Sequence, residues 1–98
     1  MIEVRWTPQA ADDLQAIHDF IARDSPRYAR AEVERIVGAV DRLEIFPDSG
    51  RVVPEYDRAD IREVIEPPYR LVYRRQPDVL FVLMIFRASR SIPAIPGS

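Results

Sequence analysis

"VLFVLMIFRASRS", residues 79–91, is the stretch that decides the fold of this chain. Eight consecutive apolar residues, 79–86, lead directly into Arg87 and Arg90. A short apolar run without alternation is typical of a strand that is covered on both faces. The stretch therefore predicts a central strand that brings two arginines to an edge of the protein. Those arginines form an active site, a binding patch or merely the solvated end of a strand.

Two more strands are predicted immediately before this one, over residues 61–65 and 69–75. The connections between the three runs, "EPP" and "QPD", are short enough to favour an antiparallel meander. Successive side chains of the middle run point to opposite faces of the sheet. One face is predicted to hold Tyr69, Leu71 and Tyr73, and the other face Arg70, Val72 and Arg74.

The N-terminal part is predicted to form a strand and two helices. "IEVRW", residues 2–6, alternates apolar and charged side chains as a half-buried strand does. Thr7 and Pro8 are suited to cap and begin a helix that ends near Asp24. Ser25-Pro26 stops that helix and caps a second one, which is expected to run to Phe46-Pro47. Because the loop between them is short, the helices form an antiparallel hairpin.

The predicted architecture is α+β, in the order β-α-α-β-β-β, with the helical hairpin packed on one face of a small, mainly antiparallel sheet. Two prolines and a glycine interrupt residues 47–60, so this segment is predicted to be a loop. We expect one domain over residues 1–92 and a flexible, Pro-rich tail over residues 93–98. Asp12 and Asp13 are interpreted as complementing the dipole at the start of the first helix.

Composition excludes several kinds of site. The 98 residues include 14 arginines and no lysine, 16 acids and no cysteine, with a net charge of −2. Without cysteine there is no disulfide and no thiolate metal site, and without a basic excess there is no general field that attracts nucleic acid. No apolar run approaches the roughly 20 residues that span a bilayer, and no export signal is visible, so we expect a cytoplasmic protein without membrane contact.

Few residues could support catalysis. The single histidine, His18, is interpreted as lying on the flank of the first helix, and neither a metal site nor a cofactor site is predicted. Two groups remain as candidates, the arginines of the last two strands and the loop acid Glu55. If Arg70 and Arg87 share a sheet face, they can hold a phosphate or carboxylate in bidentate fashion. The alternative is that both groups are ordinary solvated side chains.

Four segments together resemble the RelE/ParE superfamily of bacterial toxins, over roughly residues 2–90. They are "VRWTPQAADDLQAIHDFIA", "FPDSGRVVPE", "IREVIEPPYRLVYRR" and "VLMIFRASR". The resemblance implies the toxin of a type II toxin–antitoxin module. Its partner would be a ParD-like antitoxin that binds DNA and forms a hetero-oligomer with the toxin, so that the toxin itself contacts no specific DNA sequence.

Superfamily members of the RelE type cleave mRNA on the ribosome, whereas those of the ParE type inhibit DNA gyrase. Arg70 matches an arginine that contacts the scissile phosphate in some nucleases, and Glu55 lies where certain nucleases carry an acid. Where many members carry a histidine near the end of the last strand, this chain has Phe86 or Arg87. Arginine cannot serve as a general base, so the resemblance favours a gyrase inhibitor that is not itself an enzyme.

The functional residues are assigned on that basis. Arg70, Arg87 and Arg90, with the C-terminal tail, are expected to contact gyrase. Leu14, Ile21 and Arg74 are expected to contact the antitoxin. The alternatives are a nuclease that uses Glu55, Arg70 and Arg87, and an inactive remnant that only binds antitoxin.

Overall fold

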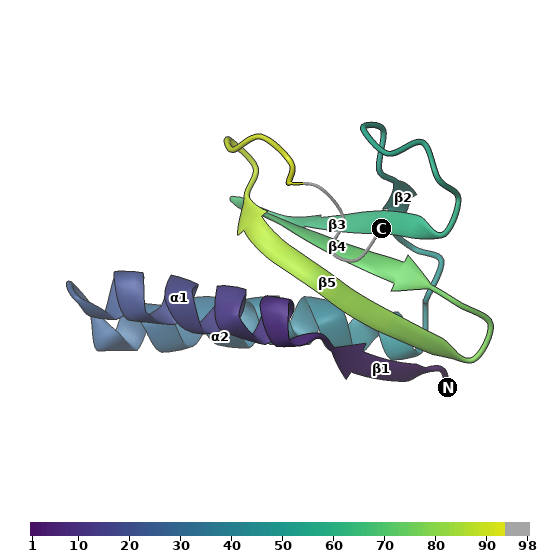
Figure 1. The fold of residues 1–98 in the computed structure, drawn as a ribbon. Coiled ribbons are helices and arrows are strands. Elements are labelled where there is room, and N and C mark those ends of the chain that lie inside the picture. Colours follow the sequence, from purple (N-terminus) through teal and green to yellow (C-terminus); the bar gives the residue numbers. More distant parts are fainter. Residues whose placement is uncertain (94–98) are drawn as a thin grey trace.

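The computed structural model describes residues 1–93, and over that range two helices pack on one face of a five-stranded sheet (Figure 1). The helices are α1 (Pro8–Ala22) and α2 (Pro26–Asp41), and the 3-10 turn η1 (Arg42–Glu44) follows α2. The strands are β1 (Glu3–Trp6), β2 (Arg51–Val52), β3 (Ile61–Glu66), β4 (Tyr69–Arg75) and β5 (Val79–Arg87). This order confirms the predicted α+β fold. The two-residue strand β2 is an addition, since it lies in the segment predicted to be a loop.

Both helices begin where the sequence predicts. The Thr7 hydroxyl accepts a hydrogen bond from the Ala10 N–H at 3.2 Å, and the Ser25 hydroxyl accepts one from the Tyr28 N–H at 3.1 Å. Each cap is followed directly by a proline in the first turn. The helix α2 ends earlier than predicted, because the chain tightens into η1, which keeps Leu43 in the core at 1% exposure.

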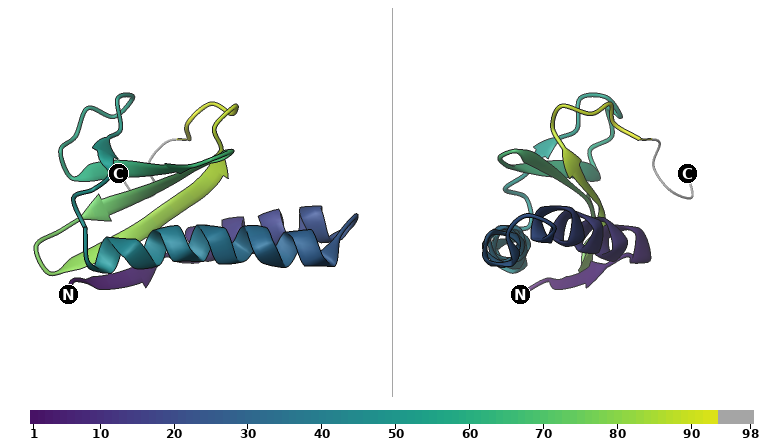
Figure 2. Two further views of the ribbon diagram at one scale, coloured as in Figure 1. Left: turned by 180° about the vertical axis from the view of Figure 1, so that it is seen from behind. Right: turned by 90° about the vertical axis from the view of Figure 1, so that its left-hand side faces the viewer.

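The strand order is β1-β5-β4-β3-β2, with β1 parallel to β5 and every other pair antiparallel. The strand β5 therefore has a neighbour on each side, which confirms that it is central. The strand β1 pairs only with residues 79–82 of β5. The helical hairpin crosses one side of the sheet, and its tip extends beyond the end of β5 (Figures 1 and 2).

The sheet carries a core on each face. The helix-side cluster includes Tyr69, Leu71 and Tyr73, and the outer cluster includes Val72 with residues of β3 and β5, as the alternation of β4 predicts. The outer cluster is covered by the loop before β3 and by the segment that follows β5. These two segments are joined, because the Tyr56 hydroxyl donates a hydrogen bond to the Pro93 carbonyl. Burial on both faces explains why β5 is apolar without interruption.

A β-bulge divides β5 into two halves. Val72 of β4 lies opposite Met84, but Tyr73 lies opposite Val82, so that Leu83 is an extra residue in β5. Val82 and Ile85 consequently both face the helices, whereas Leu83 and Met84 both belong to the outer cluster. The bulge also changes which residues of β5 direct their backbone groups toward the β1 side of the sheet.

Gly50 is required where the loop before β2 lies against the sheet. The Tyr73 hydroxyl accepts the Gly50 N–H at 3.1 Å and donates to the Pro47 carbonyl at 2.8 Å. A Cβ atom on Gly50 would lie 2.6 Å from the Tyr73 hydroxyl oxygen and 2.7 Å from the Glu63 carbonyl oxygen. The glycine therefore permits a close approach that any side chain would prevent.

Candidate functional site

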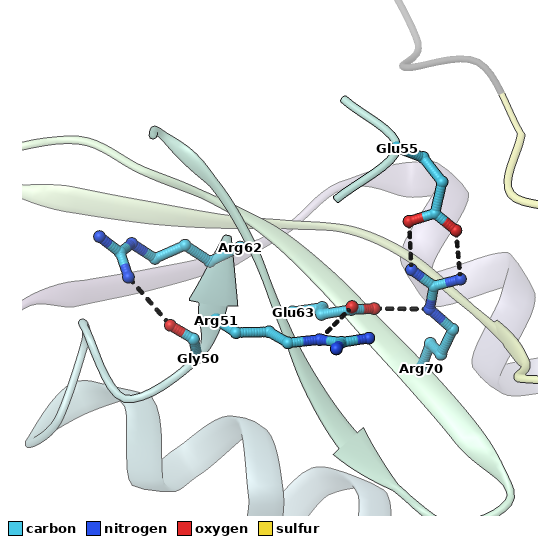
Figure 3. Close-up of polar contacts among 6 residues, drawn as sticks. All are labelled: Gly50, Arg51, Glu55, Arg62, Glu63 and Arg70. Atoms are coloured by element: carbon cyan, nitrogen blue, oxygen red, sulfur yellow. Dashed lines mark hydrogen bonds and ion pairs between the residues drawn. The ribbon is translucent and has the colours of Figure 1, made fainter. Parts of the chain in front are cut away.

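Arg70 lies on the outer face of β4 and is bound by two carboxylates (Figure 3). Its Nη1 and Nη2 atoms each donate a hydrogen bond to the Glu55 carboxylate at 3.0 Å. Its Nε atom donates to Oε1 of Glu63 at 2.5 Å. Bidentate pairing of this kind is the strongest arrangement that a guanidinium and a carboxylate form. With 8% of its surface exposed, Arg70 is a component of the interior rather than a free surface cation.

Glu63 connects this pair to a second arginine. Its side chain is fully buried, and its Oε2 atom accepts a hydrogen bond from Nε of Arg51 at 2.7 Å. Two carboxylates and two guanidinium groups thus form a continuous chain, in the order Glu55, Arg70, Glu63 and Arg51. We call this chain the outer-face network. A buried charge is tolerated when it is paired and hydrogen-bonded. In this network each buried group meets that condition.

The network also fixes the protonation of Glu55. Hydrogen bonding to the Arg70 guanidinium is the main cause that lowers the pKa of Glu55 from 4.5 to about 2. The pKa of Arg70 is raised, first by Glu55 and then by Glu63. A carboxylate with so low a pKa has little tendency to accept a proton near neutral pH. Glu55 is therefore a poor general base in this arrangement.

Arg87 lies on the opposite side of the sheet from Arg70. In the register of β4 and β5, Arg87 is opposite Tyr69 and Arg70 is opposite Phe86. Each guanidinium lies over the aromatic ring of the neighbouring strand on its own face, 5.4 Å from the ring centre for Arg70 and 5.9 Å for Arg87. Arg70 and Arg87 could hold one phosphate together only if they shared a face of the sheet. They lie on opposite faces, so this prediction is wrong.

Arg87 and Arg90 are exposed at the end of β5. The Arg90 N–H donates to the Arg87 carbonyl at 3.0 Å, which closes the turn that follows the strand. Among residues 1–93, neither guanidinium forms an ion pair with a carboxylate. These two cations are thus available to a partner, in contrast to Arg70.

Two adjoining hollows, of about 220 and 260 Å³, lie between α1 and the end of β5. Asp13, Ile85, Phe86 and Arg90 line both. The first extends to the turn after β5, and the second extends along α1 to Phe20, which is 67% exposed. We call this feature the α1/β5 groove. Met84, Ile85 and Phe86 are among its apolar lining residues, and Arg87 and Arg90 are its lining arginines.

The residues predicted to contact an antitoxin do not come together. Leu14 is partly buried and packs against the helix-side cluster, and Ile21 is partly buried on the same helix. Arg74 lies on the outer face, opposite Phe81, with its Nε atom 3.9 Å from Asp60 Oδ2. Of the tail predicted over residues 93–98, only Pro93 is described, and its carbonyl accepts the hydrogen bond from the Tyr56 hydroxyl. Residues 94–98, and the target contact predicted for them, are outside the described range.

Two residues in these sites, Glu63 and Phe20, were not singled out from the sequence, and a third, Asp13, was given a different role. Glu63 could have been found from the alternation of β3, since it shares the face of Ile61. Phe20 lies outside the apolar stripe of α1, and this position could have identified it as an exposed aromatic residue. Asp13 was interpreted as a dipole residue, but its Oδ2 atom accepts the Ile85 N–H of β5 at 2.9 Å. No local pattern reveals that contact.

His18 lies on the flank of α1 beside Asp19, with Nδ1 3.1 Å from Oδ1. Within residues 1–93, no group of three or more histidine, cysteine or acidic side chains is arranged to hold a metal ion. The helices of that range are also too short or too polar to cross a membrane.

Comparison with known proteins places this geometry in context. The family described as "ParE toxin of type II toxin-antitoxin system, parDE" matches residues 4–92. "Toxin RelE2" of Caulobacter vibrioides is 35% identical over 91 residues, which are 92% of this chain and 99% of that protein. The structure titled "Chromosomal ParDE TA system from P. aeruginosa" has a TM-score of 0.73 at 29% identity, covering 89% of this chain and 96% of that one.

A more distant structure has a similar fold. It is titled "The crystal structure of the toxin-antitoxin complex RelBE2 (Rv2865-2866) from Mycobacterium tuberculosis". Its TM-score is 0.55 at 24% identity, covering 88% of this chain and 96% of that one. The same backbone arrangement thus occurs in structures titled as ParDE and as RelBE2, so that the fold alone does not identify a target.

Proposed function

Because the chain belongs to the ParE toxin family of type II toxin–antitoxin systems, we propose that it inhibits DNA gyrase and does not cleave mRNA. The outer-face network carries this proposal. Arg70 and Glu55 match the phosphate-binding arginine and the acid of the superfamily nucleases, but here they neutralise each other. A nuclease would need this arginine free for phosphate and a base with a pKa nearer to neutrality.

The groups that remain for target binding are Arg87 and Arg90. Both are exposed and without an ion pair in the described range. Arginines of this kind bind a partner's carboxylates or phosphates through planar, bidentate contacts. They require no proton transfer, which fits an inhibitor that acts by binding. Arg70 then has a structural role, and it contributes to the target surface only indirectly, by holding the outer face in place.

The antitoxin is the second partner in this proposal. The matched family and the P. aeruginosa structure are both described as toxin–antitoxin systems. An antitoxin would neutralise this toxin by covering the exposed arginines and the apolar surface around them. The protein encoded beside this chain is the first candidate, and its complex with the toxin is expected to be a hetero-oligomer in the cytoplasm.

A paired assay tests the target. Purified toxin is added to a gyrase supercoiling reaction and, separately, to a translating ribosome reaction that is analysed by primer extension. We expect inhibited supercoiling and intact mRNA. Arg87→Glu combined with Arg90→Glu should raise the inhibitory concentration at least tenfold. Arg27→Glu with Arg30→Glu, an equal charge change on α2, should leave it within about twofold. Cleaved mRNA with unaffected gyrase would contradict the proposal.

The name of the Caulobacter relative, RelE2, keeps mRNA cleavage as a second candidate. In that case Glu55→Gln and Arg70→Ala should both abolish cleavage in the ribosome reaction. If neither activity appears and expression harms no cell, the chain is instead a remnant that only binds antitoxin.

A further inference from the structure

The N-terminal strand β1 forms one edge of the sheet and has a free side. Among residues 1–93, β1 pairs with β5 alone. Figures 1 and 2 show β1 at the lower margin of the fold, with β5 above it, so the side of β1 that faces away from β5 is directed out of the molecule. A strand edge with unpaired backbone groups is a template for another strand.

The backbone of β1 determines which residues can bond at this free edge. The Glu3 N–H donates a hydrogen bond to the Asp78 carbonyl at 3.3 Å, at the start of the pairing with β5. In a strand, the N–H and the C=O of one residue point to the same side, and those of the next residue point to the other side. Val4 and Trp6 therefore direct their N–H and C=O groups to the free edge.

The side chains of β1 alternate in both polarity and charge. Ile2, Val4 and Trp6 are partly buried and pack against the helix-side cluster. Glu3 and Arg5 lie on the opposite face with 51% and 62% of their side chains exposed, and Arg5 Nε is 2.5 Å from Glu3 Oε2. The order along the strand is thus apolar, acid, apolar, base, apolar. An antiparallel copy of this strand has the complementary order.

One register of two such strands brings opposite charges together. Antiparallel pairing about a twofold axis places the same edge of both copies in contact. With the axis at Val4, the two Val4 residues form a hydrogen-bonded pair, and Glu3 of each copy lies opposite Arg5 of the other. An axis at Glu3 or at Arg5 would instead place two identical charges opposite each other, which is destabilising.

We propose that two copies of this chain dimerise through the free edges of β1, in antiparallel register centred on Val4. The two five-stranded sheets then become one continuous sheet. The four charges at positions 3 and 5 alternate in sign around the axis, because each has an opposite charge beside it on its own strand and across from it. On the other face, the exposed parts of Ile2 and Trp6 cover each other across the axis.

The contact is short. The Ile2 N–H is already bonded to the Glu44 carbonyl at 3.2 Å, so we expect the pairing to end at this residue. An interface of this size predicts a dimer that forms as the protein concentration rises. The end of β5, which carries Arg87, lies at the opposite margin of the fold in Figure 1 and stays uncovered. The dimer is therefore independent of the target proposed above.

Reversing the charges tests the register. Sedimentation velocity over a concentration series should show a dimer for the wild type. Glu3→Arg and Arg5→Glu should each weaken dimerisation at least tenfold, because both cross-strand pairs become repulsive. Glu34→Arg and Arg30→Glu make the same charge changes at exposed positions of α2 and should alter it less than about twofold.

Mixing the two β1 variants provides a sharper test. Glu3→Arg carries two cations at these positions and Arg5→Glu carries two carboxylates, so an equal mixture should form a heterodimer although each variant alone does not. The chain that carries both substitutions should dimerise like the wild type, within about threefold. This recovery distinguishes loss of the interface from loss of the fold.

Hydrogen exchange tests the backbone part. The Val4 amide should exchange several-fold more slowly at high than at low wild-type concentration, and this difference should vanish in Glu3→Arg. The Thr7 amide is the control, because it bonds to the Val82 carbonyl at 3.1 Å within one copy and should show no dependence on concentration.

Three results would overturn the proposal. The first is a wild type that stays monomeric up to its solubility limit. The second is a dimer that tolerates both charge reversals, since another surface then forms it. The third is a monomeric toxin whose Val4 amide is protected only by the protein encoded in the adjoining reading frame, because the edge then belongs to that partner.

Discussion

Arg70 and Arg87 lie in adjacent residue pairs of β4 and β5, and each packs on the aromatic ring with which it is paired. Their environments nevertheless differ. Arg70 faces outward under the loop before β3 and is held by Glu55 and Glu63. Arg87 faces the helix side at the end of β5 and has no carboxylate partner among the described residues. The same residue type thus stabilises the fold at one position and remains available for binding at the other. The two arginines differ because they lie on opposite faces of the sheet, and only the outer face is covered by the loop that carries Glu55.

The largest expected effect comes from removing the buried cation. Arg70→Ala should lower the free energy of unfolding by about 3 kcal/mol, because it leaves the fully buried Glu63 with only the solvent-exposed Arg51 as a partner, whereas Arg51→Ala leaves Glu63 paired with the buried Arg70. Urea denaturation followed by far-UV circular dichroism measures this. Arg51→Ala is the control, since Arg51 is 62% exposed and its loss should cost less than about 1 kcal/mol. Equal losses would show that burial does not determine the strength of the network.

A smaller effect is expected from the pH dependence of the same network. The folded-state pKa of Glu55, about 2, is below its ordinary value of 4.5, so the unfolded chain binds more protons between these values. The stabilisation by Glu55 is therefore complete above pH 4.5 and is lost as the pH falls to about 2. Glu55→Gln should reduce the melting temperature near neutral pH, and its difference from the wild type should shrink toward pH 2. A constant difference would contradict the assigned pKa.

The smallest effect on stability is expected at Arg87. Its contact with the Tyr69 ring is at an exposed site, where such contacts contribute about 0.5–1 kcal/mol. Arg87→Ala should therefore change the free energy of unfolding by no more than about 1 kcal/mol in the same urea titration, while weakening antitoxin or gyrase binding. A loss comparable to that of Arg70→Ala would show that Arg87 is structural too.

The sequence by itself determined the two helices, four of the five strands, the place of β5 inside the sheet and the superfamily. Each depends on patterns within a few residues, such as the caps Thr7 and Ser25 or the alternation of β4. The tertiary structure decided that Arg70 pairs with Glu55 and Glu63, that Arg87 faces the other way, and that Asp13 reaches Ile85. These contacts join residues far apart in the chain, and they depend on the bulge at Leu83 and the strand register. A shift of the strand register by one residue moves every side chain of that strand to the opposite face. No local sequence pattern specifies the register.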